Sequence, residues 1–129
     1  MTGGDDSCEA IDRSVLASLR ELQEEGEPDI IAEVSGLFIK HAPEKISAIM
    51  QAAEKGDAKG LQMAAHSLKS SSAYVGAMHL SAMSKDLELM GRSGAMVGAK
   101  DKAEMLKEEY MRVQAALEAE TKAADYRNC

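Results

Sequence analysis

Apolar residues near the carboxyl end of the chain recur at alternating intervals of three and four residues, and this spacing strongly constrains the fold. An α-helix has about 3.6 residues per turn, so such positions gather into one stripe that packs against other helices. The stripe consists of Ala103, Leu106, Tyr110, Val113 and Leu117. We predict that this helix starts between residues 96 and 101 and that the polar residues 121–129 fray.

Four earlier segments carry comparable apolar stripes. The first begins at a capping Asp12 and ends at Gly26. The others are expected as helices over residues 29–54, 58–75 and 77–90. In chain order, the inward positions of the four segments are Val15, Leu16, Leu19 and Leu22; Ile31, Val34, Phe38, Ala42, Ile49 and Ala53; Leu61, Ala65, Leu68, Ser72 and Val75; and Leu80, Met83, Leu87 and Met90.

Proline and glycine mark where these helices bend or stop. Pro43 lies inside the second stripe, which keeps its phase on both sides. We therefore expect one long helix with a kink, because proline lacks the N–H donor and crowds the preceding turn. Gly76 is expected to break the third helix, and Gly91 together with residues 93–94 to close the fourth.

These segments predict an all-α fold, an antiparallel up-down four-helix bundle with a short additional N-terminal helix. The bundle is expected over residues 11–120, between a flexible tail at 1–10 and a polar C-terminal tail at 121–129. Aromatic residues make up only 3% of the 129 residues. The chain relies instead on Ala, Leu, Met, Glu and Lys, which favour helices, and this argues against a β-sandwich or barrel.

The charge and the cysteines exclude several classes of function. A net charge of −7 argues against nucleic acid as the main partner and against an anionic membrane surface. No apolar run approaches the roughly 18 residues of a membrane span, and no basic-then-apolar leader opens the chain. Cys8 and Cys129 form neither a metal spacing nor a disulfide framework. We therefore predict a cytoplasmic, monomeric protein without a cofactor.

One of the three histidines, His66, falls on the outward side of its helix. At about 100° per residue, it lies roughly 140° from the direction of the inward positions. Gln62, Lys69, Ser70 and Ala73 share its side. The imidazole is therefore expected in solvent, with an ammonium group one turn further along. A zinc site is not indicated, because no two histidines have i, i+4 spacing.

An exposed imidazole of this kind can act as a nucleophile. Near pH 7 it is mostly neutral, and one ring nitrogen has a free lone pair. A phosphoryl group accepted there would place negative charge beside Lys69. The chain has no P-loop glycine pattern, no kinase-like Gly-rich loop and no acidic cluster suited to Mg²⁺. This favours a stoichiometric phosphoryl carrier, not an enzyme with autokinase activity or a nucleotide site.

The segment around His66 reads AHSLKSSSAYVGA over residues 65–77. It resembles the histidine-containing phosphotransfer (HPt) family of two-component phosphorelays, whose pattern has alanine before the histidine, leucine and lysine two and three positions after it, and a closing glycine-alanine pair. The resemblance covers about residues 12–120. It implies that His66 accepts a phosphoryl group on Nε2 from a receiver-domain phospho-aspartate and passes it to another receiver aspartate. Response-regulator receivers, including that of a hybrid sensor kinase, are the implied partners.

The resemblance also implies roles for other residues. Lys69 matches the lysine that screens the phosphoryl charge. Glu88 falls where many members place a Gln or Glu that hydrogen-bonds the imidazole, fixing its tautomer and leaving Nε2 free. Helix phase places Glu88 on the flank of its helix and outside the core. Ser70 stands where the family usually has a glycine that lets the partner approach, so the partner range and the transfer rate stay open.

Exposed residues around His66 predict a docking patch. Met63 points outward one turn before His66, and an exposed apolar residue there favours docking over a scattered surface methionine. With Gln62, Ser70 and Ala73 it would contact the receiver.

One alternative is a non-phosphorylated helical interaction module that binds and modulates a receiver or an enzyme. Another is a dimerisation-type histidine-kinase domain, but its motif has an acidic residue directly after the histidine, where this chain has Ser67.

Overall fold

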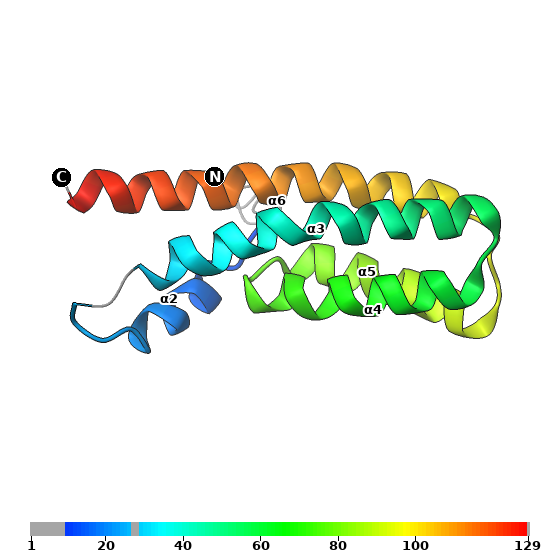
Figure 1. Cartoon of the computed structure of the whole chain (residues 1–129), viewed down its shortest axis with the longest axis horizontal. Coiled ribbons are helices and arrows are strands. Elements are labelled where there is room, and N and C mark those ends of the chain that lie inside the picture. Colours follow the sequence, from blue (N-terminus) through cyan, green and yellow to red (C-terminus); the bar gives the residue numbers. More distant parts are fainter. Residues whose placement is uncertain (1–9, 27–28, 129) are drawn as a thin grey trace, which may run out of the picture.

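The computed structural model describes residues 10–26 and 29–128, with side chains described as far as residue 120. In these ranges it contains no strand. The helices are α2 (Arg13–Glu21), α3 (Ile30–Lys55), α4 (Ala58–Tyr74), α5 (Met78–Ser93) and α6 (Ala99–Asn128). Figure 1 shows the four longer helices side by side in alternating direction, with α2 near the α4–α5 turn. This confirms the all-α bundle with a short leading helix.

The boundaries of the bundle remain a prediction. Of the expected tail at residues 1–10, all but residue 10 lies outside the described residues. At the other end, α6 continues as a helix to Asn128, beyond the expected boundary at residue 120. None of the described helices has an apolar stretch long enough to cross a membrane.

Aspartate side chains cap the N-termini of three of the helices. The carboxylate of Asp12 accepts a hydrogen bond from the Ser14 backbone N–H, which confirms the predicted cap of α2. Asp29 and Asp57 cap α3 and α4 in the same way. Such caps satisfy N–H groups that have no partner inside the helix. The caps therefore fix where α3 and α4 begin, and with them the register of the residues that follow.

One predicted helix end is wrong, and another is correct only in part. The leading helix ends at Glu21, five residues before Gly26, and Leu22 is 72% exposed because it already lies beyond the last turn. Gly91 does not end α5, but the predicted stop at residues 93–94 is confirmed, since α5 continues to Ser93 and closes at Gly94 in the left-handed conformation. Gly91 is buried inside α5, where its missing side chain allows the backbone of α4 to approach.

Helix α3 continues through Pro43, as predicted for a single long helix. Figure 1 shows its N-terminal half tilted relative to its C-terminal half. Proline cannot donate to the carbonyl four residues earlier, that of Ile39. The hydroxyl of Tyr110 on α6 donates to this carbonyl oxygen at 3.4 Å. A neighbouring helix thus supplies the hydrogen bond that Pro43 cannot make.

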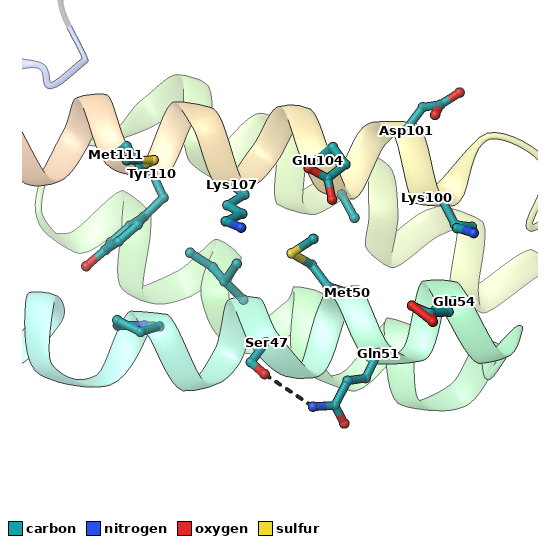
Figure 2. A pocket seen from close by; sticks show the side chains of 13 residues that line it. Ser47, Met50, Gln51, Glu54, Lys100, Asp101, Glu104, Lys107, Tyr110 and Met111 are labelled. Carbon is teal, nitrogen blue, oxygen red and sulfur yellow. Dashed lines mark hydrogen bonds between the residues drawn. The ribbon is translucent and has the colours of Figure 1, made fainter.

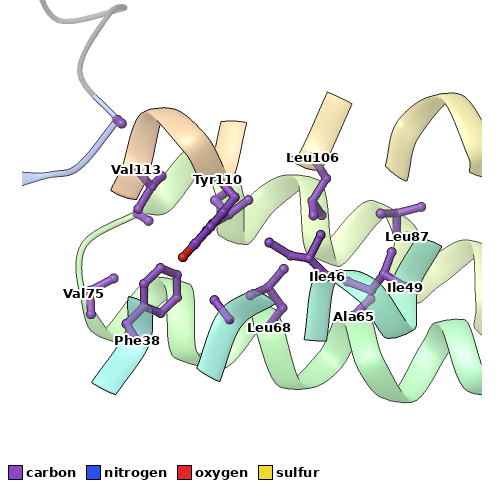
Figure 3. Packing of buried hydrophobic residues seen from close by; sticks show 14 of the residues in the cluster. Phe38, Ile46, Ile49, Ala65, Leu68, Val75, Leu87, Leu106, Tyr110 and Val113 are labelled. Carbon is purple, nitrogen blue, oxygen red and sulfur yellow. The ribbon is translucent and has the colours of Figure 1, made fainter. Parts of the chain in front are cut away.

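The apolar stripes meet in one core between the four longer helices. Figure 3 shows Phe38, Leu68 and Tyr110 pointing toward one another, and the rings of Phe38 and Tyr110 have centroids 5.9 Å apart. All five predicted stripe positions of α6 and all five of the third segment are buried. Val15, Val34, Met83 and Met90 are only partly buried. With its inward stripe fixed in this core, α4 presents the opposite side to solvent.

Candidate functional site

His66 lies on the outer side of α4, and 60% of its side chain is exposed. Ala65 and Leu68, on the inward stripe of the same helix, are fully buried. The helical phase is therefore fixed firmly enough that the imidazole cannot turn into the core. This confirms the predicted exposure of His66.

The imidazole is held by a carboxylate on the neighbouring helix. His66 Nδ1 lies 2.7 Å from Glu88 Oε2 of α5. Lys69 Nζ lies 2.7 Å from the other oxygen, Oε1. Arg92 Nη2 donates to Oε2 at 3.1 Å. One carboxylate thus accepts hydrogen bonds from three side chains, and we call these four residues the Glu88 cluster.

Glu88 is more deeply buried than the sequence predicted. Only 3% of its side chain is exposed, although helix phase placed it outside the core. The phase was correct in direction, since Glu88 points at α4, but α4 packs so closely there that the carboxylate is covered. A buried carboxylate is tolerated only with charged or hydrogen-bonding partners, which Lys69, His66 and Arg92 provide.

The partners keep Glu88 ionised. The hydrogen bond from Lys69 lowers the pKa of the Glu88 carboxyl below its ordinary value, against the effect of burial, and the hydrogen bond from His66 lowers this pKa further. A carboxylate can only accept hydrogen bonds, so Nδ1 of His66 carries the proton. In the neutral ring the free lone pair is then on Nε2, the nitrogen away from Glu88.

Lys69 lies one turn beyond His66, as the sequence predicted, but its ammonium group is not free in solvent. Its side chain is 29% exposed, and its ammonium group is paired with Glu88. It nevertheless lies next to the imidazole, because both groups bind the same carboxylate. Arg92 was not predicted at all. Its i, i+4 spacing from Glu88 on α5 was the signal that could have indicated it.

The predicted docking residues surround His66 with different degrees of exposure. Met63 is 63% exposed and Ser70 is exposed, whereas Gln62 and Ala73 are half-buried. The Ser70 hydroxyl donates to the backbone carbonyl of His66 at 3.4 Å, within its own helix. This hydroxyl is thus turned along the helix surface, so Ser70 adds little bulk where the resemblance expects glycine.

A groove between α3 and α4 runs past His66, and the sequence did not indicate it. Besides His66 and Ser70, its lining includes Phe38 and the exposed apolar side chains of Leu37 and Tyr74. We call it the α3–α4 groove. Apolar residues left exposed on two adjacent helices suit contact with another protein.

A second hollow lies between α3 and α6. Figure 2 shows Met50 and Lys107 directed into it, with Tyr110 at one end. The only hydrogen bond drawn there joins Gln51 to Ser47. None of the predicted site residues lines this hollow. Among the described residues, no group of three or more His, Cys, Asp or Glu side chains is arranged to hold a metal ion.

Comparison with known proteins agrees with this geometry. The family model described as the Hpt domain matches residues 33–119, which include the whole Glu88 cluster. The chain belongs to the Hpt family. Its relatives include histidine-containing phosphotransfer protein 4 of Arabidopsis thaliana, 32% identical over 102 residues that cover 78% of this chain and 80% of the relative.

A solved structure extends the comparison to the fold. The crystal structure of histidine-containing phosphotransfer protein B (HptB) from Pseudomonas aeruginosa PAO1 superimposes with a TM-score of 0.78. The match has 30% identity and covers 88% of this chain and 96% of HptB. Membership in the Hpt family makes this protein a phosphotransfer intermediate of two-component signalling that interacts with receiver domains.

Proposed function

We propose that His66 is the phosphoacceptor of this Hpt domain and that it relays phosphoryl groups between receiver aspartates. Nε2 attacks the phosphorus of a receiver phospho-aspartate. The N–P bond forms as the acyl O–P bond breaks, and the aspartate leaves as a carboxylate. In the second half-reaction, the carboxylate of another receiver aspartate attacks the same phosphorus and neutral imidazole leaves.

The contact between His66 Nδ1 and Glu88 Oε2 is the observation that carries this proposal. It keeps a proton on Nδ1 and leaves Nε2 as the nucleophile. The phosphorylated ring is cationic while Nδ1 is protonated, and the ionised Glu88 stabilises that cation at 2.7 Å. When the phosphoryl group departs, the retained proton lets the ring leave as neutral imidazole.

Lys69 supplies the positive charge for the phosphoryl group. Its ammonium binds the same carboxylate as the imidazole, so a modest movement of a flexible side chain brings it toward phosphoryl oxygens on Nε2. Stabilising that negative charge favours both formation and survival of the phosphorylated histidine.

The receiver docks over the outer face of α4. Gln62, Met63, Ser70 and Ala73 surround the imidazole, and the α3–α4 groove provides an adjoining apolar surface. The receiver brings the catalytic groups, Mg²⁺ included, and this chain acts as a stoichiometric carrier in the cytoplasm. A monomer suits this task, because the exposed face of α4 must accept first one receiver and then another, including that of a hybrid sensor kinase.

Transfer of radiolabelled phosphate from a phosphorylated receiver tests the proposal. The wild-type protein should become labelled, with a label that resists alkali and is lost in acid, as expected for an N–P bond. His66→Gln should remain unlabelled. His79→Gln is the matched control, because it removes another exposed histidine, on α5, and should be labelled like wild type.

Two results would contradict the assignment. Label retained by His66→Gln would place the acceptor at another residue. Receiver binding that is equal in wild type and His66→Ala, with no transfer in either, would instead favour the non-phosphorylated interaction module.

A further inference from the structure

Glu88 has more charged partners than orientation of the imidazole requires. The partners bind different oxygens of the carboxylate. Lys69 Nζ lies 2.7 Å from Oε1, whereas His66 Nδ1 lies 2.7 Å and Arg92 Nη2 3.1 Å from Oε2. Since 3% of the side chain is exposed, water can scarcely replace a lost partner. When one donor leaves, the others must compensate for its charge.

Lys69 has two tasks that compete for one ammonium group. In the structure it neutralises Glu88, and in the proposed function it also neutralises a phosphoryl group on Nε2. Glu88 lies on the Nδ1 side of the ring, so phosphoryl oxygens on Nε2 draw Nζ away from Oε1. Without a further cation, the buried carboxylate would either retain Lys69 or keep only the phosphorylated imidazole ring as a charged partner, with Oε1 left without a donor.

We infer that Arg92 is a positioning residue that keeps the Glu88 carboxylate paired and directed at His66 Nδ1 while Lys69 turns to the phosphoryl group. This inference rests on the proposed function of His66. Arg92 suits the task because a guanidinium is always charged and offers several N–H donors in one plane. It lies one turn after Glu88 on α5, so it keeps its place beside the carboxylate when groups on α4 move.

An alternative is that Arg92, which is 59% exposed, touches the phosphoryl group directly. The two mechanisms differ in what they predict for the imidazole when Lys69 is absent. A positioning Arg92 is then the remaining permanently charged partner of the buried Glu88, so removing it as well should disturb the carboxylate and the Nδ1–H tautomer of His66. A guanidinium that binds only the phosphoryl group would leave that tautomer unchanged.

The test measures the rate of phosphoryl acceptance at saturating labelled receiver in four proteins: wild type, Arg92→Ala, Lys69→Ala and the double variant. Arg92→Ala should slow acceptance about tenfold in the wild-type background, the scale of one charge-assisted hydrogen bond. In the Lys69→Ala background it should slow acceptance at least as much, because Glu88 then has neither Lys69 nor Arg92 as a partner. Arg92→Lys should recover part of the rate. Lys102→Ala removes an exposed charge from α6 and should leave the rate unchanged.

Nitrogen NMR of His66 in the unphosphorylated proteins gives a second readout. Arg92→Ala should retain the Nδ1–H tautomer, because Lys69 still pairs with Glu88 before phosphorylation. Loss of that tautomer would mean that Arg92 is simply part of the resting structure, which would overturn the inference.

The transfer rates and the tautomer together distinguish failure of this inference from failure of the proposed function. An Nδ1–H tautomer retained in the double variant would indicate direct contact of Arg92 with the phosphoryl group, and a wild-type rate in Arg92→Ala would show that Arg92 has no part. Either result overturns the positioning role while labelling of wild type leaves the relay standing. Absence of labelling in wild type would overturn the relay itself, and the role of Arg92 with it.

Discussion

Gly91 lies on the side of α5 that meets α4, and its replacement by alanine tests how closely the two helices must approach. An ideal Cβ at Gly91 would lie 2.5 Å from the carbonyl oxygen of Ala58 and 2.6 Å from the backbone nitrogen of Gln62. Both are backbone atoms of α4, so no side-chain rotation relieves the overlap. The helices would have to separate by about 0.9 Å, the difference between 2.5 Å and the 3.4 Å at which ordinary contact begins.

This separation should reduce both stability and transfer. Overpacking costs about 1–3 kcal/mol, and the overlap is with rigid backbone, so the upper part of this range applies and outweighs the gain of roughly 1 kcal/mol in helix propensity from glycine to alanine. We expect the unfolding free energy of Gly91→Ala to fall, by up to about 2 kcal/mol. The same movement would lengthen the contact between His66 Nδ1 and Glu88 Oε2 from 2.7 Å to about 3.6 Å, beyond a hydrogen bond. Acceptance of phosphoryl groups should slow although no reacting group has changed.

Urea unfolding followed by far-UV circular dichroism measures the first effect, and labelling by a phosphorylated receiver measures the second. Gly36→Ala is the matched control, because Gly36 lies in α3 and an added Cβ there meets nothing within 4 Å. It should stabilise the protein by about 0.5–1 kcal/mol and leave transfer unchanged. If Gly91→Ala were as stable and as active as Gly36→Ala, the close approach of α4 and α5 would be refuted.

Two further predictions concern stability. Because the pKa of Glu88 is lowered from 4.5 in the folded protein, its carboxylate contributes stability above about pH 4.5 that is lost as the pH falls through the lowered value. Acidification through this window should therefore cost wild type more unfolding free energy than Glu88→Gln, and equal losses would contradict the pairing. Tyr110→Phe removes the hydrogen bond to the Ile39 carbonyl and should lower the unfolding free energy by about 0.5–1 kcal/mol in urea titrations. Unchanged stability would mean that the 3.4 Å contact contributes nothing.

Helical periodicity predicted the elements better than their ends. The stripe in α6 was found without error, because a three-four alternation over five positions leaves few other structures possible. Gly91 was interpreted as a terminator, since glycine disfavours helices, but here the benefit of close helix packing outweighs that propensity. Such a benefit depends on the neighbouring helix and is invisible in the local sequence.

In the site, too, the sequence predicted what a single helix determines but missed what depends on a neighbouring helix. Exposure of His66 follows from the phase of a single helix, and the sequence predicted it. The pairing of Lys69 with Glu88 joins residues on two helices, so phase alone gave each a direction but no distance. The resemblance to the HPt family pointed to Glu88 as a partner of the imidazole, but not to its burial or to Arg92.

Helix α5 controls the chemistry of a histidine that belongs to α4. Because Gly91 has no side chain to hold α4 and α5 apart, Glu88 lies against the imidazole and is shielded from water. Burial makes the hydrogen bond to Nδ1 stronger and also makes any unpaired charge on Glu88 more costly. The close packing that orients His66 therefore also creates the need for a second cation, and Arg92, one residue after Gly91, lies where it can meet that need.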